Sequence, residues 1–135
     1  MSLFIDTNIL VYAHDTQAGE RYRLANEKVS QLWTLEPAPS LSIQVLQELY
    51  VNLIRKKIPT DEVRWTVEDY MTWNIILTDT MLLAQAMHSV QRWQVSLWDA
   101  LIIEVARRAG ASELGSEDLN TGQDFAGVRV VNPLA

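Results

Sequence analysis

Short apolar runs and longer amphipathic stretches alternate along the chain. The apolar runs end at polar residues or prolines, and a short run bounded in this way is typical of a buried β-strand. The pattern predicts strands at residues 3–6, 39–41, 74–78, 112–115 and 128–131.

The stretches between these runs repeat their apolar positions with the period of an α-helix. They predict helices at residues 19–35, 42–57, 60–73, 80–93 and 96–109. Ser42 and Ser96 are expected to cap the starts of two helices, and Gly110 is expected to end the last one. Residues 118–127, which are rich in Gly, Asn and Asp, are expected to form a loop.

Alternating strands and helices indicate an α/β fold with a central parallel sheet and helices on both faces. A chain of 135 residues favours one domain that covers residues 1–135. In such a sheet, ligands bind outside the carboxyl ends of the strands. Asp6 follows the first predicted strand, so we expect its carboxylate at the rim of the sheet.

Composition narrows the choice of function. The chain has no cysteine, which excludes disulfides and thiolate metal sites, and His14 and His88 do not form a zinc-binding pair. We find no apolar run that could span a bilayer and no basic leader segment, so we expect a cytoplasmic protein.

Charge argues against nucleic-acid binding by bulk electrostatics, because 17 acidic residues outnumber 11 basic ones. A cluster of carboxylates that binds divalent cations would account for part of this excess. The basic residues gather at Arg55-Lys56-Lys57, Arg64 and Arg107-Arg108, which we interpret as solvated faces. The five tryptophans lie mostly in helix patterns, which favours a core or interface role over base stacking.

Asp6 and Glu48 each have a structural and a functional interpretation. Asp6 follows a strand, where an aspartate commonly caps the next helix. It also opens a D-x-D pattern of the kind that phosphatases use, although the third residue here is Asn8. Glu48 lies on a polar helix face, which indicates solvent exposure but is also compatible with lining a cleft. The other members of that face are Gln44, Gln47, Asn52 and Arg55.

Asp99 lies near the start of its predicted helix, outside the polar stripe formed by Glu104, Arg107 and Arg108. Two interpretations stay open. Ser96-x-x-Asp99 has the spacing of a capping box, and an inward-facing aspartate near a helix start is also well placed to bind a metal.

Asp118 lies in a segment with the composition of a surface turn. Residues 118–124 also match part of a calcium-binding loop, D-x-N-x-G-x-D. The match lacks ligands that an EF-hand requires, so we favour the turn over calcium.

Taken in order, these segments resemble a known family. FIDTNILVYAHD, LQELYVN, SLWDALI, SEDLNTGQDF and RVVNP resemble the PIN domain, and most closely the VapC-type toxin ribonucleases of bacterial toxin–antitoxin pairs. The resemblance spans nearly the whole chain. Its most specific parts are D-T-N-I-L-V-Y and W-D-A-L-I, about ninety residues apart.

The resemblance implies an acidic site whose carboxylates fall on Asp6, Glu48, Asp99 and Asp118. Two polar positions that accompany these acids in the family fall on Asn8 and Ser116. Asp124 falls on a position where the family varies. The resemblance also implies a homodimer, for which the apolar positions of the helices at 19–35 and 42–57 could supply a face.

The chemistry of such a site suits phosphodiester cleavage. Carboxylate oxygens favour hard cations such as Mg²⁺, or Mn²⁺ as a substitute. A bound cation lowers the pKa of water and stabilises charge on a phosphate. We therefore expect a Mg²⁺-dependent endoribonuclease that acts on RNA and is inhibited by a cognate antitoxin.

Two other functions remain open. The chain could be an RNA- or protein-binding module with the PIN fold and little turnover. It could also be a small-molecule phosphatase with Asp6 as the nucleophile, which Asn8 disfavours.

Overall fold

The computed structural model describes residues 2–135, and its centre is one six-stranded sheet with the order β3-β2-β1-β4-β6-β5. The strands are β1 (Leu3–Ile5), β2 (Ser40–Ser42), β3 (Asn74–Ile76), β4 (Glu113–Gly115), β5 (Asp124–Phe125) and β6 (Val128–Val131). All neighbouring strands pair in parallel except β5, which runs antiparallel to β6. The predicted α/β class with a mainly parallel sheet is confirmed.

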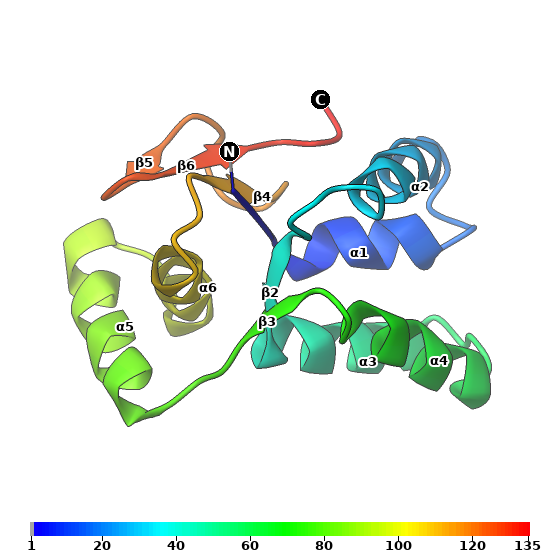
Figure 1. The fold of residues 1–135 in the computed structure, drawn as a ribbon, viewed down its shortest axis with the longest axis horizontal. Coiled ribbons are helices and arrows are strands. Elements are labelled where there is room, and N and C mark those ends of the chain that lie inside the picture. Colours follow the sequence, from blue (N-terminus) through cyan, green and yellow to red (C-terminus); the bar gives the residue numbers. More distant parts are fainter. Residues whose placement is uncertain (1) are drawn as a thin grey trace.

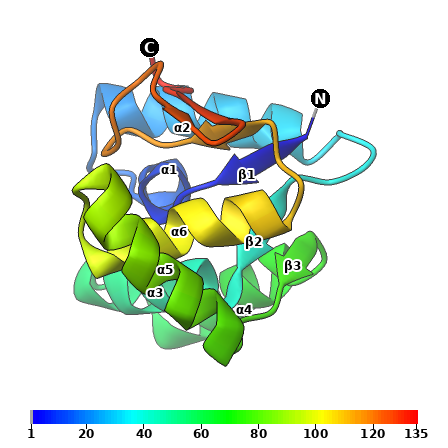
Figure 2. The ribbon, with the colours of Figure 1, turned by 90° about the vertical axis from the view of Figure 1, so that its left-hand side faces the viewer.

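Helices cover both faces of the sheet. They are α1 (Thr7–His14), α2 (Glu20–Leu32), α3 (Ile43–Arg55), α4 (Thr60–Tyr70), α5 (Thr80–Trp93) and α6 (Leu97–Arg108). Figure 1 shows α5 and α6 on one side of the strands and α1 to α4 on the other. Figure 2 shows α6 crossing the sheet, and α5 packs against α6. Within residues 2–135, no helix combines the length and apolarity needed to cross a membrane.

Two elements were missed by the sequence pattern. Helix α1 is buried almost all round, at Thr7, Ile9, Leu10, Val11 and Ala13. Its residues therefore show little helical alternation between apolar and polar positions. Strand β5 lies inside the segment expected to be a loop, and two residues are too few to display a strand period.

The helix caps predicted at Ser42, Ser96 and Gly110 are confirmed, whereas α2, α3 and α4 end two or three residues earlier than predicted. The hydroxyl oxygens of Ser42 and Ser96 each accept a hydrogen bond from a backbone N–H in the first turn of α3 and α6. Gly110 follows α6 with a φ of +72°, a conformation that glycine adopts at little cost. Its N–H donates to the carbonyl of Arg107, and the N–H of Ala111 donates to that of Ala106. These two bonds form a Schellman motif.

One polar residue lies deeper than the pattern of α6 indicated. Glu104, expected on the polar stripe, is only 4% exposed. Its Oε1 accepts a hydrogen bond of 2.5 Å from Ser89 Oγ on α5, and Arg107 Nη1 lies 3.0 Å from its Oε2. Because both carboxylate oxygens have partners, the group can be buried between α5 and α6.

Strand β1 determines where a site can form. It pairs with β2 on one side and with β4 on the other. After β1 the chain adds β2 and β3 on one side of it, and then returns to add β4, β5 and β6 on the other side. The carboxyl ends of β1 and β4 therefore meet at the topological switch point, where open α/β sheets bind their ligands. Asp6 follows β1 and Ser116 follows β4, which brings residues 110 positions apart to the same point.

Close packing at this point leaves no room beside Gly115, the last residue of β4. A Cβ atom there would lie 3.0 Å from Ile5 Cδ1 and 3.1 Å from Pro133 Cγ. We expect Gly115→Ala to lower the free energy of unfolding by about 1–3 kcal/mol through overpacking. Urea denaturation measures this change.

The matched control is Gln31→Ala on the exposed surface of α2, which should change stability by less than about 0.5 kcal/mol. Equal stabilities for Gly115→Ala and the parent would show that the contact relaxes without cost.

Candidate active site

Four carboxylates expected to act together line one cavity of about 310 Å³. The cavity opens at the carboxyl ends of β1 and β4, between α1, α3 and α6. The carboxylates belong to Asp6, Glu48, Asp99 and Asp118.

Asp6 is the most enclosed of the four, at 7% exposure. Its Oδ1 accepts a hydrogen bond of 2.7 Å from the backbone N–H of Thr7, at the start of α1. Its Oδ2 accepts 2.8 Å from Ser116 Oγ and 3.5 Å from Asn8 Nδ2. Asp6 therefore caps α1, as one interpretation expected, and also faces the cavity.

The surroundings of Asp6 make its carboxylate difficult to ionise. Burial raises the pKa of Asp6 from its ordinary value of 3.8 to about 6, and the nearby carboxylates of Asp118 and Glu48 add to the rise. The hydrogen bonds from Ser116 and Thr7 act in the opposite direction. A group that holds its proton this firmly is common at functional sites.

Glu48 projects from α3 toward Asp6. Its Oε1 accepts a hydrogen bond of 2.9 Å from Thr7 Oγ1 and one of 3.4 Å from Gln44 Nε2. The polar face of α3 thus lines a cleft at Gln44, Glu48 and Asn52. Solvent exposure, the interpretation favoured by the pattern alone, was wrong for these three positions.

Asp99 lies in the first turn of α6 on the opposite wall. Its backbone N–H donates to Ser96 Oγ at 3.1 Å, and its side chain is half-buried. Burial raises the pKa of Asp99, and the carboxylate of Asp118 contributes to the rise. Asp99 therefore belongs to the capped turn and also lines the cavity, and its role as a metal ligand stays a prediction.

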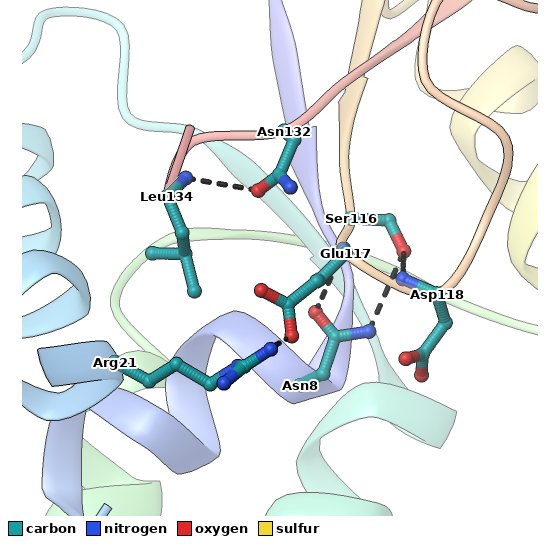
Figure 3. A network of polar contacts seen from close by, with 7 residues as sticks. All are labelled: Asn8, Arg21, Ser116, Glu117, Asp118, Asn132 and Leu134. Carbon is teal, nitrogen blue, oxygen red and sulfur yellow. Dashed lines mark hydrogen bonds and ion pairs between the residues drawn. The ribbon is translucent and has the colours of Figure 1, made fainter. Parts of the chain in front are cut away.

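The loop after β4 holds Asp118 in place through Ser116 (Figure 3). Ser116 Oγ accepts a hydrogen bond of 3.1 Å from the backbone N–H of Asp118. Asn8 joins the same network, because its Nδ2 lies 3.4 Å from Ser116 Oγ and its Oδ1 accepts 3.2 Å from the N–H of Glu117. Asn8 and Ser116 thus contact the acidic residues directly, as expected for positioning groups.

A comparison with protein families now assigns the fold. The PIN domain model matches residues 3–125. The chain belongs to the PIN domain family. A comparison with curated proteins found no match.

Solved structures of two bacterial proteins share the fold of this PIN domain. One is a toxin–antitoxin complex from Klebsiella pneumoniae, with 22% identity, a TM-score of 0.72 and coverage of 98% of both chains. The other is VapC20 from Mycobacterium tuberculosis, described as a sarcin–ricin loop cleaving toxin. It has 18% identity, a TM-score of 0.70, and coverage of 87% of this chain and 90% of its own.

The donor set of the PIN domain suits a hard cation. Every acid at the cavity offers carboxylate oxygens, which Mg²⁺ and Mn²⁺ prefer. Within residues 2–135, however, no three acidic or histidine side chains lie close enough together to form a ready-made metal group. Mutual repulsion of the carboxylates opposes such a cluster, and a bound cation removes that repulsion.

Asp124, the weaker candidate, does not join the site. It lies in the β5–β6 hairpin, where its Oδ1 accepts a hydrogen bond from the N–H of Gly127. Asp118 instead faces the acidic cavity. The two aspartates of the partial calcium loop are therefore not brought together.

The sequence pattern missed several residues at the site. Thr7 donates to Glu48, while Lys56 and Trp98 line the cavity. Arg21 on α2 forms a 2.8 Å ion pair with Glu117 beside Asp118 (Figure 3). Thr7 could have been inferred from its place beside Asp6, but Arg21 gave no signal, because it contacts a residue 96 positions away.

The raised pKa of Asp6 makes stability depend on pH. The unfolded chain loses this proton near pH 3.8 and the folded chain near pH 6, so stability falls as pH rises between these values. Asp6→Asn carries no charge and escapes this loss. We expect its stability advantage over the parent to grow by about 2–3 kcal/mol between pH 4 and pH 7.

Urea denaturation of the metal-free proteins across this pH range measures the advantage. A difference between parent and variant that stays constant with pH would refute the assignment of a raised pKa to Asp6.

Proposed function

We propose that this PIN domain is a Mg²⁺- or Mn²⁺-dependent endoribonuclease that hydrolyses RNA phosphodiester bonds. The observation that carries the proposal is the meeting of four carboxylates at one cavity, at the switch point of the sheet. Four carboxylates at one cavity repel a phosphate, so their chemistry calls for a cation between protein and substrate.

Each residue has a role in the proposed site. Asp6, Glu48, Asp99 and Asp118 would hold the cation through their carboxylate oxygens. When bound, the cation supplies an acidified water and stabilises charge on the phosphate. Ser116, Asn8 and Thr7 keep the acids in place by the hydrogen bonds described above.

A proton on Asp6 opposes binding of the proposed cation. The pKa of Asp6 near 6 means that its carboxylate is available as an ionised ligand above about pH 6. Below that pH a proton and a cation compete for the same oxygens. At limiting cation concentration, the proposed nuclease therefore gains activity as the pH rises and the proton leaves Asp6.

We further propose that the nuclease is the toxin of a type II toxin–antitoxin pair and acts in the cytoplasm. Both structural neighbours carry descriptions of toxins or a toxin–antitoxin complex, which supports this proposal. A cognate antitoxin would cover the acidic cavity with a basic side chain. A homodimer is also part of the proposal, and the exposed Tyr50, Val51 and Ile54 on α3 offer an apolar face for it.

Cleavage of RNA tests the nuclease. The protein, purified free of antitoxin, is incubated with a mixed set of structured RNAs in Mg²⁺, in Mn²⁺ or in EDTA. We expect cleavage with either metal and none in EDTA. Asp6→Asn and Asp99→Asn should each lower the rate at least about 100-fold, because each removes a charged ligand.

The control variant is Asp61→Asn, which changes a surface aspartate in the first turn of α4 and should cleave like the parent. Cleavage that survives in EDTA, or in both site variants, would point to a contaminating ribonuclease and against the proposed site.

A binding module with little turnover is the second candidate, because no ready-made group of three acids exists among the described residues. Metal binding without cleavage would favour it. We expect Mn²⁺ at about 100 times its Kd to stabilise the parent by about 2.7 kcal/mol. The double variant Asp6→Asn, Asp99→Asn should show much less stabilisation.

Thermal denaturation with and without Mn²⁺ measures this effect. The same small shift in parent and double variant would place any bound metal away from the four acids.

A further inference from the structure

One helix forms a continuous wall of the acidic cavity. Gln44, Glu48, Asn52 and Lys56 recur every four residues along α3 and its C-terminal cap, and all four line the cavity. At about 1.5 Å per residue, the wall from Gln44 to Lys56 is about 18 Å long. An aromatic side chain, Trp98, lies at one end of the wall, and a basic side chain, Lys56, lies at the other.

Trp98 lies at the end of the wall beside Gln44, whose Nε2 is 3.5 Å from the carbonyl oxygen of Trp98. The residue is 64% exposed. It lines the acidic cavity and also a neighbouring hollow of about 420 Å³ that includes Leu83 and Leu101. The indole ring of Trp98, which precedes Asp99 in the sequence, therefore lines the same cavity as this acid.

Lys56 lies at the opposite end. Among the described residues that line the cavity, it is the only one with a positive charge. Its Nζ is 3.1 Å from Oδ2 of Asp15, whose side chain is 10% exposed, while the Lys56 side chain is 47% exposed. The ion pair holds the ammonium group at the rim and leaves part of it open to a second anion.

We propose that Trp98 and Lys56 contact the substrate and make this wall a track for RNA, with an unpaired base stacked on Trp98 and a backbone phosphate bound by Lys56. The inference rests on the proposed nuclease function and names two residues that would position its substrate. The acidic residues lie between the two contacts, so a strand that makes both contacts passes over them.

The chemistry of the two contacts favours a single strand over a duplex. Stacking on an aromatic side chain requires a base face that a double helix already covers. The proposed role of Trp98 differs from the expectation, which favoured a core or interface role for the tryptophans over base stacking.

Trp98 is tested by the binding of a short, fluorescein-labelled, single-stranded RNA of mixed sequence in Mg²⁺. Binding is measured by anisotropy in the Asp6→Asn background, so that cleavage does not interfere. We expect Trp98→Ala to raise Kd about tenfold and Trp98→Phe to restore most of the affinity. Trp65→Ala is the matched control, because Trp65 is 55% exposed on α4 but does not line the cavity.

Lys56 is tested by the salt dependence of the same binding. For a single strand, loss of one phosphate contact lowers the slope of log K against log salt by about 0.7. We expect this change for Lys56→Gln and none for Lys57→Gln, since Lys57 is exposed outside the cavity. Asp15→Asn breaks the same ion pair but keeps the ammonium group, so its slope should match that of the background.

The outcomes separate this inference from the nuclease itself. Weaker binding by Trp98→Ala and Lys56→Gln supports the track even if the parent cleaves no RNA. Cleavage by the parent with unchanged binding in both variants overturns the track and leaves the nuclease standing. Equal affinity for the single strand and for its duplex, or loss of antitoxin binding alone in the variants, also overturns it.

Discussion

The hydrogen bond between Ser116 Oγ and Asp6 Oδ2 is the contact on which the site depends. It joins the carboxyl ends of β1 and β4, the two central strands that meet where the chain changes direction across the sheet. The same hydroxyl oxygen lies within hydrogen-bonding distance of Asn8 Nδ2 and the N–H groups of Asp118 and Leu119. One small side chain thus links a strand end, a helix start and a loop.

The proposed metal binding requires a charged Asp6, whereas the stability of the folded state favours a neutral one. Burial and neighbouring carboxylates raise the pKa of Asp6, which means that the folded state resists the charge that the proposed chemistry uses. Hydrogen bonds from Ser116 and Thr7 reduce the energetic penalty but do not remove it. Destabilised active sites of this kind are a common feature of enzymes, and the apolar core beneath the sheet supplies the compensating stability.

Much of the fold was predictable because each amphipathic helix and each apolar strand carries its own local period. Helix α1 was not, since burial on all sides removes that period. Asp6 was predictable as a rim residue from topology alone. The place of Glu48 in the cleft was not predictable from the helical pattern, because a polar helix face looks the same whether it meets solvent or a cleft, and only the family resemblance indicated it. The burial of Glu104 was not predictable from the helical pattern either, since its hydrogen-bond partner Ser89 lies on another helix.

The two-sided structure of α3 has a consequence for how this molecule can diversify. Its apolar side packs Val45, Leu49 and Leu53 into the core, while the side that faces the cavity contributes little to packing. Substitutions at Gln44 or Asn52 can therefore accumulate without unfolding the domain. The shape and charge of the cavity wall can therefore change while the core packing of α3 and the four acids stay the same.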